Sequence, residues 1–158
     1  MSATSAPYGF VPVKHPSGCS NARDYKIATG YATAIYKGQP VVLDTTGVIT
    51  AGGAGADILG IFAGCQYNEV NGKPTVSNTL PASTTATNII AYVWDDPLTE
   101  FSVQGDGSYA QTAVGDQVDV SNATANGNGM SQATTGTVKT AGQQGQFRIL
   151  GFDGSVAN

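Results

Sequence analysis

Charge, histidine and cysteine are all scarce in this chain of 158 residues. It has seven Lys and Arg, 11 Asp and Glu, one His and two Cys, and charged residues make up only 11%. An ordinary soluble domain has about 25%. Seven scattered cations do not form the basic face that binds a phosphate backbone, so we expect no nucleic-acid partner. One His and two distant Cys are too few for a four-ligand zinc site.

Long apolar runs are also missing. The longest candidate, residues 58–65, has the length of a strand, whereas a helix needs about 20 apolar residues to cross a bilayer. The first ten residues, MSATSAPYGF, have neither the basic nor the apolar segment of a secretory signal. We therefore expect synthesis in a cytoplasm, no membrane partner and reduced thiols. Cys65 is expected in the core, and the pairing of Cys19 stays open.

Glycine and apolar residues are plentiful instead. The chain contains 21 Gly, seven Tyr and five Phe, and 41% of its residues are hydrophobic. A chain of this length buries roughly 70% of its unfolded surface, which is enough for a core without disulfides. Gly, Thr, Ser and Asn favour turns and strands over helices. The composition predicts an all-β domain and excludes a helical bundle.

The first 24 residues form a segment distinct from the rest. Pro7, Pro12 and Pro16 each lack an N–H and push the preceding residue towards an extended backbone. The apolar residues among them, such as Phe10 and Val13, would not be needed in a solvated tail. We expect residues 1–24 to be an extended arm that lies on a partner and residues 25–158 to be a single β-domain. The alternative is an edge segment packed on its own domain.

Short strands separated by turn residues are predicted along the rest of the chain. Asn71-Gly72 is typical of a tight hairpin, Gly60 and Gly64 indicate a bulge or bend, and residues 121–129 form a loop. The predicted strands are 25–29, 32–36, 40–44, 48–50, 58–67, 75–78, 89–94, 99–103, 109–112, 118–120, 135–139 and 147–152.

An internal similarity indicates a repeat. Residues 38–43 (GQPVVL) resemble residues 115–120 (GDQVDV), and each is followed by a Leu-Gly strand, at 58–62 and 149–152. Two such units in one small barrel would pair their Leu-Gly strands in its core. With only two copies, chance similarity remains the alternative.

No reaction class emerges from the polar residues. His15, the sole histidine, lies in the proline-rich segment, where an interface or solvent is a better interpretation than catalysis. Asp95 and Asp96 point to opposite sides of an extended chain, so they are no acid–base pair. Calcium and phosphate loops are incomplete, and we expect no metal, no cofactor and no enzyme. Trp94 is either a core residue or an exposed interface anchor.

Six segments of the chain together resemble a known family. In order they are PYGFVPVKHPSG, IATGYATAIYKGQPVVL, ILGIFAGCQY, AYVWDDP, GDQVDV and QFRILGF, and they span roughly residues 7–152. This order is similar to that of the small capsid decoration (cement, head auxiliary) proteins of tailed bacteriophages. The resemblance implies a small β-barrel or tulip-like β-domain. It also implies a non-enzymatic virion protein that binds the outer surface of an icosahedral head and stabilises the shell.

The resemblance further implies the partners. They are the major capsid protein and other copies of the chain, with a homotrimer favoured and a dimer possible. The residues expected to contact the capsid or a neighbouring subunit are Tyr8, Phe10, Val11, Pro12, Lys14 and His15. Two other classes remain open: a phage tail or fibre module that binds host glycans, and a cellular β-barrel enzyme or ligand carrier.

Overall fold

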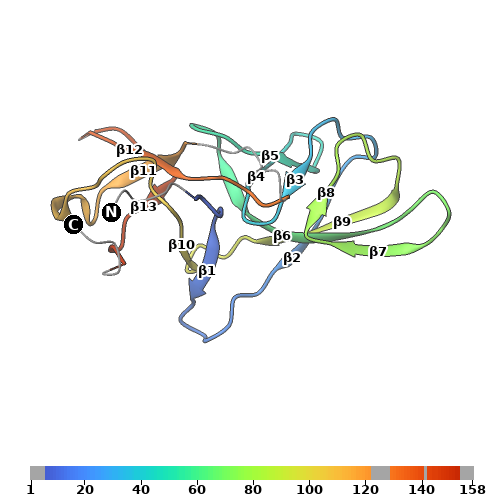
Figure 1. Ribbon diagram of the computed structural model, residues 1–158, viewed down its shortest axis with the longest axis horizontal. Coiled ribbons are helices and arrows are strands. Elements are labelled where there is room, and N and C mark those ends of the chain that lie inside the picture. The colour runs from blue at the N-terminus through green and yellow to red at the C-terminus, as the bar shows by residue number, and fades with distance from the viewer. Residues whose placement is uncertain (1–5, 122–128, 141, 154–158) are drawn as a thin grey trace.

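The computed structural model describes residues 6–121, 129–140 and 142–153 (Figure 1). Residues 1–5 of the expected arm and 122–128 of the predicted loop lie outside this part of the chain. The described elements are 13 strands and one 3-10 turn, η1 (Gln111–Ala113), which confirms the all-β prediction. They form four sheets, and none of these closes into a barrel, so the barrel or tulip form is not confirmed. Nowhere in the described residues is there a helix suited to spanning a membrane.

The largest sheet has the strand order β2–β9–β6–β4–β5, with β7 beside the second half of β6. Its strands are β2 (Arg23–Lys26), β4 (Pro40–Leu43), β5 (Ile49–Ala51), β6 (Ile58–Asn68), β7 (Pro74–Ser77) and β9 (Thr87–Trp94). Alternate residues of β9, Ile89, Ala91 and Val93, are buried on one face, as the period of two requires. That face forms the first core, and the short pair β3 (Ile35–Tyr36) and β8 (Thr79–Leu80) adds Ile35 and Leu80 to it.

The rest of the chain builds two smaller sheets. One is the three-stranded sheet β12 (Thr135–Val138), β11 (Gln117–Val120) and β13 (Phe147–Arg148), and the other is the ribbon of β1 (Val11–Lys14) and β10 (Glu100–Ser102). In Figure 1 the three-stranded sheet lies at one end of an elongated molecule and the six-stranded sheet at the other, with the ribbon between them.

A second core lies between these sheets. It consists of Phe10, Ile61, Val120 and Ala133, with four larger side chains packed against it. These four are Trp94, Phe101, Val103 and Phe147. Ile61 and Phe62 are consecutive on β6, so their side chains point to opposite faces, and β6 contributes to both cores.

Several strand predictions are corrected by the structure. Residues 109–112 were expected as a strand, but this prediction is wrong: Ala113 N–H bonds back to Ala110 O at 2.9 Å, and the chain turns as η1. Tyr109 is held by its hydroxyl, which donates to the carbonyl of Gly136 rather than pairing as a strand. The last strand ends at Arg148 instead of residue 152. Beyond it, Ile149 still bonds the chain before β11, through its N–H to Asp116 O and its carbonyl to Gly115 N–H, and residues 150–152 pair with no described strand.

The predicted repeat is partly confirmed. The first strand of each unit along the chain is central in its sheet, in the orders β5–β4–β6 and β12–β11–β13. A glycine with positive φ precedes each of these strands, Gly38 (83°) before β4 and Gly115 (99°) before β11. The expected pairing of the two Leu-Gly strands is wrong: within the described residues β6 pairs with β4, β7 and β9, and β13 pairs only with β11. The bulge expected in β6 is present between Phe62 and Gly64.

Candidate interaction surface

The predicted contact residues lie on or beside the β1–β10 ribbon. The two strands are antiparallel, with Val11 opposite Ser102 and Pro12 opposite Phe101. The register then shifts so that Lys14 faces Glu100, which makes Val13 the extra residue of a bulge. Neither strand pairs with any other described strand, so the ribbon has two open edges. Pro12 suits such a strand because its missing N–H costs least at an edge.

The two faces of the ribbon differ. Phe101 points inward, where its ring meets Phe10 edge-on with the centroids 6.2 Å apart. Val11 and Val13 point outward, and Val13 has 61% of its surface exposed. Tyr8, also exposed, has its hydroxyl 2.9 Å from Ser102 Oγ on this outer side. The result is an apolar strip with few charges on a projecting element.

Phe10 does not belong to this outer strip. Its side chain is 1% exposed, and its ring stacks on Phe147 with the centroids 4.7 Å apart. Its amide donates to Gly38 O at 2.9 Å. A Cβ on the preceding Gly9 would lie 2.8 Å from the same carbonyl, so only glycine lets the chain approach this closely. Residues 9–10 thus pack on the rest of the described chain.

Lys14 and His15 are engaged within the chain. Lys14 Nζ lies 3.5 Å from Glu100 Oε1 on the exposed end of the ribbon. His15 Nε2 lies 3.3 Å from Asp96 Oδ2, and its Nδ1 accepts the amide of Ser17 at 3.1 Å. The chain after β1 is therefore fastened to the corner that follows β9.

The two carboxylates at this corner have different environments. Asp96 has a lowered pKa, because the Leu98 amide and then His15 stabilise its charged form. Asp95 is 5% exposed at its side chain, and its Oδ2 accepts the Tyr25 hydroxyl at 2.6 Å. That hydrogen bond raises the pKa of Tyr25, with burial as the second cause. Both aspartates tie the corner to neighbouring strands.

The contacts of His15 include the members of a Ser-His-Asp triad. Ser17 Oγ lies 2.6 Å from Nδ1, and Asp96 lies on the other side of the ring. Ser17 and His15 come from one tight turn, however, and the Ser17 hydroxyl also lies 3.2 Å from the Cys19 carbonyl. The two hollows described in the structure are lined by other residues. The arrangement fastens a turn.

Metal ligands are not gathered elsewhere. Within residues 6–121, 129–140 and 142–153, no three His, Cys, Asp or Glu side chains lie close enough to hold an ion. Of the two hollows described, one lies around Tyr109 and is lined also by Asp106 and Asp116, and the other lies around Tyr67 and is lined also by Glu69.

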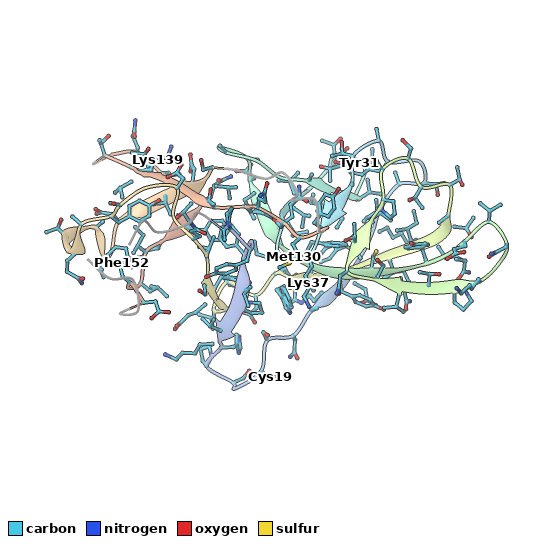
Figure 2. All side chains as sticks on the ribbon, viewed as in Figure 1. Cys19, Tyr31, Lys37, Met130, Lys139 and Phe152 are labelled. Atoms are coloured by element: carbon cyan, nitrogen blue, oxygen red, sulfur yellow. The ribbon has the colours of Figure 1, made fainter. Side chains whose placement is uncertain are left out.

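The structure places Trp94 and the two cysteines. Trp94 is half-buried against the second core, 6.5 Å from Phe101 between centroids, and Lys37 Nζ lies 5.9 Å from its ring. Cys65 is buried in the first core, as predicted, and burial raises its pKa to about 11. Cys19 is exposed, and the two thiols are not bonded to each other. Figure 2 shows Cys19 on the outer bend between β1 and β2.

One exposed apolar residue of this region was missed. Leu98 follows the Asp96 turn that leads into β10, and it is as exposed as Val13. In the sequence it stands directly after Pro97, in a segment interpreted only as a strand end. Nothing in the local pattern indicates that this turn lies near the end of β1, because that proximity depends on pairing between residues almost 90 positions apart.

Comparisons with known proteins add no relative. No family model, no curated protein and no solved structure matches the chain.

Proposed function

We propose that the chain is a non-enzymatic capsid decoration protein, which binds the outer surface of an icosahedral phage head and stabilises the shell. The observation that carries the proposal is the β1–β10 ribbon, where Val11 and Val13 point outward and no described strand covers either edge. Apolar side chains on a projecting element are a cost to an isolated protein and favour a protein partner. The ordered resemblance described above names the shell as that partner.

The ribbon is suited to a repeated weak contact. Its outer strip is small, and its only ion pair in the strand region is Lys14 with Glu100. A few apolar contacts per copy bind weakly, but many copies on one symmetric shell reinforce each other, and each clamps neighbouring shell subunits. With so few charges, binding is expected to depend only modestly on salt.

Point substitutions test the ribbon better than truncation does. Deleting the first 18 residues would remove Phe10 from the second core and so would measure stability as well as binding. The double variant Val11→Asp/Val13→Asp places charges only on the outer strip. The matched control is Val76→Asp, because Val76 is 79% exposed on β7, outside the ribbon.

The assay is co-sedimentation of each variant with purified expanded heads of the source virus. We expect the double variant to lose about tenfold or more in affinity and the control to bind as the parent does, since a buried charge without a partner is costly. Equal binding by all three proteins would reject the ribbon as the contact surface.

Copy number tests the function itself. Quantitative mass spectrometry of virions is expected to give a ratio to the main shell protein near one or a simple fraction of it. A handful of copies per particle would instead place the chain in a tail or fibre. Absence from particles would reject a virion role.

A further inference from the structure

The two repeat units can be matched bond by bond at their first strand. In each, a turn precedes the positive-φ glycine: the amide after Gly38 donates to Tyr36 O, and the amide after Gly115 donates to Ala113 O, both at 3.0 Å. Each glycine then bonds the returning strand, with Gly38 N–H to Phe62 O at 2.8 Å and Gly115 N–H to Ile149 O at 2.9 Å. Phe62 and Ile149 therefore occupy equivalent positions.

The other edge of the first strand matches as well. Gly52 N–H donates to Pro40 O in the first unit, and Lys139 N–H donates to Gln117 O in the second, both at 2.9 Å. Val41 and Val118, the next residues, are each buried. The second unit thus reproduces the three-strand order of the first and its register at the start of the strands. Further along, the register differs, because β11 and β12 shift between Val118 and Val120 whereas β4 and β5 pair without a shift.

The units differ in what lies beyond the returning strand. In the first unit, β9 pairs with β6 at Ile61, Phe62 and Gly64. The equivalent positions in the second unit are Arg148, Ile149 and Gly151, and no described strand pairs with them on that side. Among the described residues, the second unit therefore has an open edge where the first has a central strand pair.

The segment along this edge has the properties of a strand without a partner. Residues 149–153 contain neither a turn nor a bend, and their sequence was predicted as strand through residue 152. Leu150 is 62% exposed, and Phe152 is exposed on one side while it stacks on Tyr109 with the centroids 6.2 Å apart. In Figure 2 Phe152 lies at the end of the molecule away from the six-stranded sheet. An apolar open edge is a template for an added strand.

We propose that the added strand is the same segment, residues 148–152, of a second copy of this chain, paired antiparallel about a two-fold axis. The N–H and C=O of Ile149 are both used towards β11. Because backbone groups alternate along a strand, those of Arg148, Leu150 and Phe152 point to the open edge. A two-fold axis normal to the sheet places one residue opposite itself, and Leu150 is the central one of these three.

This register is chemically self-complementary. Leu150 of one copy lies opposite Leu150 of the other, and Arg148 lies opposite Phe152 of the second copy at both ends. An arginine beside an aromatic ring is a favourable pair, and no like charges face each other across the edge. The added strand continues the three-stranded sheet into a six-stranded one across the axis, and the exposed Leu150 becomes covered. This pairing does not depend on the capsid proposal.

Disulfide trapping tests the register. Directly paired antiparallel residues have Cα atoms about 5.5 Å apart, within the range that a disulfide spans. Leu150→Cys is made in a Cys19→Ser background, which removes the exposed native thiol, and Val76→Cys in the same background is the matched control. Under mild oxidation at high protein concentration, we expect the first variant to give a covalent dimer at several times the yield of the second. Equal yields would overturn the proposal.

A second measurement does not rely on an engineered bond. Sedimentation equilibrium of the parent chain is expected to show a monomer–dimer equilibrium that Leu150→Lys weakens about tenfold and Val76→Lys leaves unchanged. Circular dichroism checks that both variants keep the parent's fold, as expected for exposed positions. A parent that stays monomeric, or that forms a trimer insensitive to Leu150→Lys, would overturn the proposal whether or not the protein binds phage heads.

Discussion

At the scale of single residues, Phe10 and Val13 give opposite expectations although both lie in the proline-rich segment. Phe10→Ala removes a ring that stacks on Phe147 in the second core, and such truncations cost about 3–5 kcal/mol of unfolding free energy. Val13→Ala acts at an exposed bulge and is expected to change stability by less than about 0.5 kcal/mol. Urea denaturation of both variants measures the difference. Equal, small effects would mean that residues 6–14 are a dispensable arm.

The two thiols differ in the same way. Cys65 is buried in the first core with its pKa raised to about 11, so thiolate is scarce and access is blocked even in mildly alkaline buffer. Cys19 is exposed. Treating the native protein with N-ethylmaleimide is expected to add one label, at Cys19, and unfolding in urea to allow the second. Peptide mapping of the labelled chain shows which thiol reacted, and rapid native labelling of Cys65 would contradict this placement.

At the scale of elements, the repeat predicts the relative cost of two glycine substitutions. Gly38→Ala forces a non-glycine residue to positive φ and also brings a Cβ to 3.2 Å from the backbone of Phe10. Gly115→Ala has only the conformational cost, about 1–2 kcal/mol, because its nearest neighbour is 3.8 Å away. Gly38→Ala should therefore lose more unfolding free energy. Gly53→Ala, in open space with ordinary φ, is the control in the same denaturation series.

Elements with a local signature were predictable from the sequence. The alternation of residues 89–94 predicted most of β9, and a three-residue turn between apolar runs predicted the hairpin of β4 and β5. The turn at residues 109–112 was not predictable, because the pattern of apolar and polar residues there suits a strand. The Tyr109 hydroxyl instead bonds to the backbone of β12, which the sequence does not place nearby. The ribbon was missed for the same reason: the proximity of residues 11–14 to 100–102 is a long-range pairing.

At the scale of the whole molecule, three carboxylates make the free energy of unfolding depend on pH. Asp44, Glu69 and Asp96 have lowered pKa values, chiefly through hydrogen bonds from Thr45, Thr75 and the Leu98 amide. The folded state thus binds fewer protons than the unfolded state near the ordinary values of 3.8 and 4.5. Their contribution is present above those values and is lost as the pH falls through the lowered ones.

The urea midpoint is therefore expected to fall between about pH 6 and about pH 3. The change should be modest, because these groups are solvated. The triple variant Asp44→Asn/Glu69→Gln/Asp96→Asn should have a flatter profile than the parent. A profile as steep as the parent's would assign the acid sensitivity to other groups.

The two cores are expected to unfold together, because single residues join them. Consecutive β6 residues, Phe62 and Ile61, belong to the first and second core. The Gln146 side-chain amide, beside β13, donates to Gly53 O at 2.8 Å and accepts the Val120 amide at 2.8 Å, which links the three-stranded sheet to the loop after β5. If one core unfolded alone, these residues would lose their buried contacts. Because the two cores share them, we expect the cores to unfold in one cooperative transition.

Trp94 fluorescence reports on the second core and Cys65 labelling on the first, so the chain has a natural probe for each. Both are expected to give the same urea midpoint in the parent. In Phe10→Ala, whose direct damage lies in the second core, both midpoints should move down by the same amount. If the Trp94 transition moved alone, the three-stranded end would be an independent unit. The open edge at Leu150 would then belong to a part of the molecule that can unfold without the six-stranded sheet.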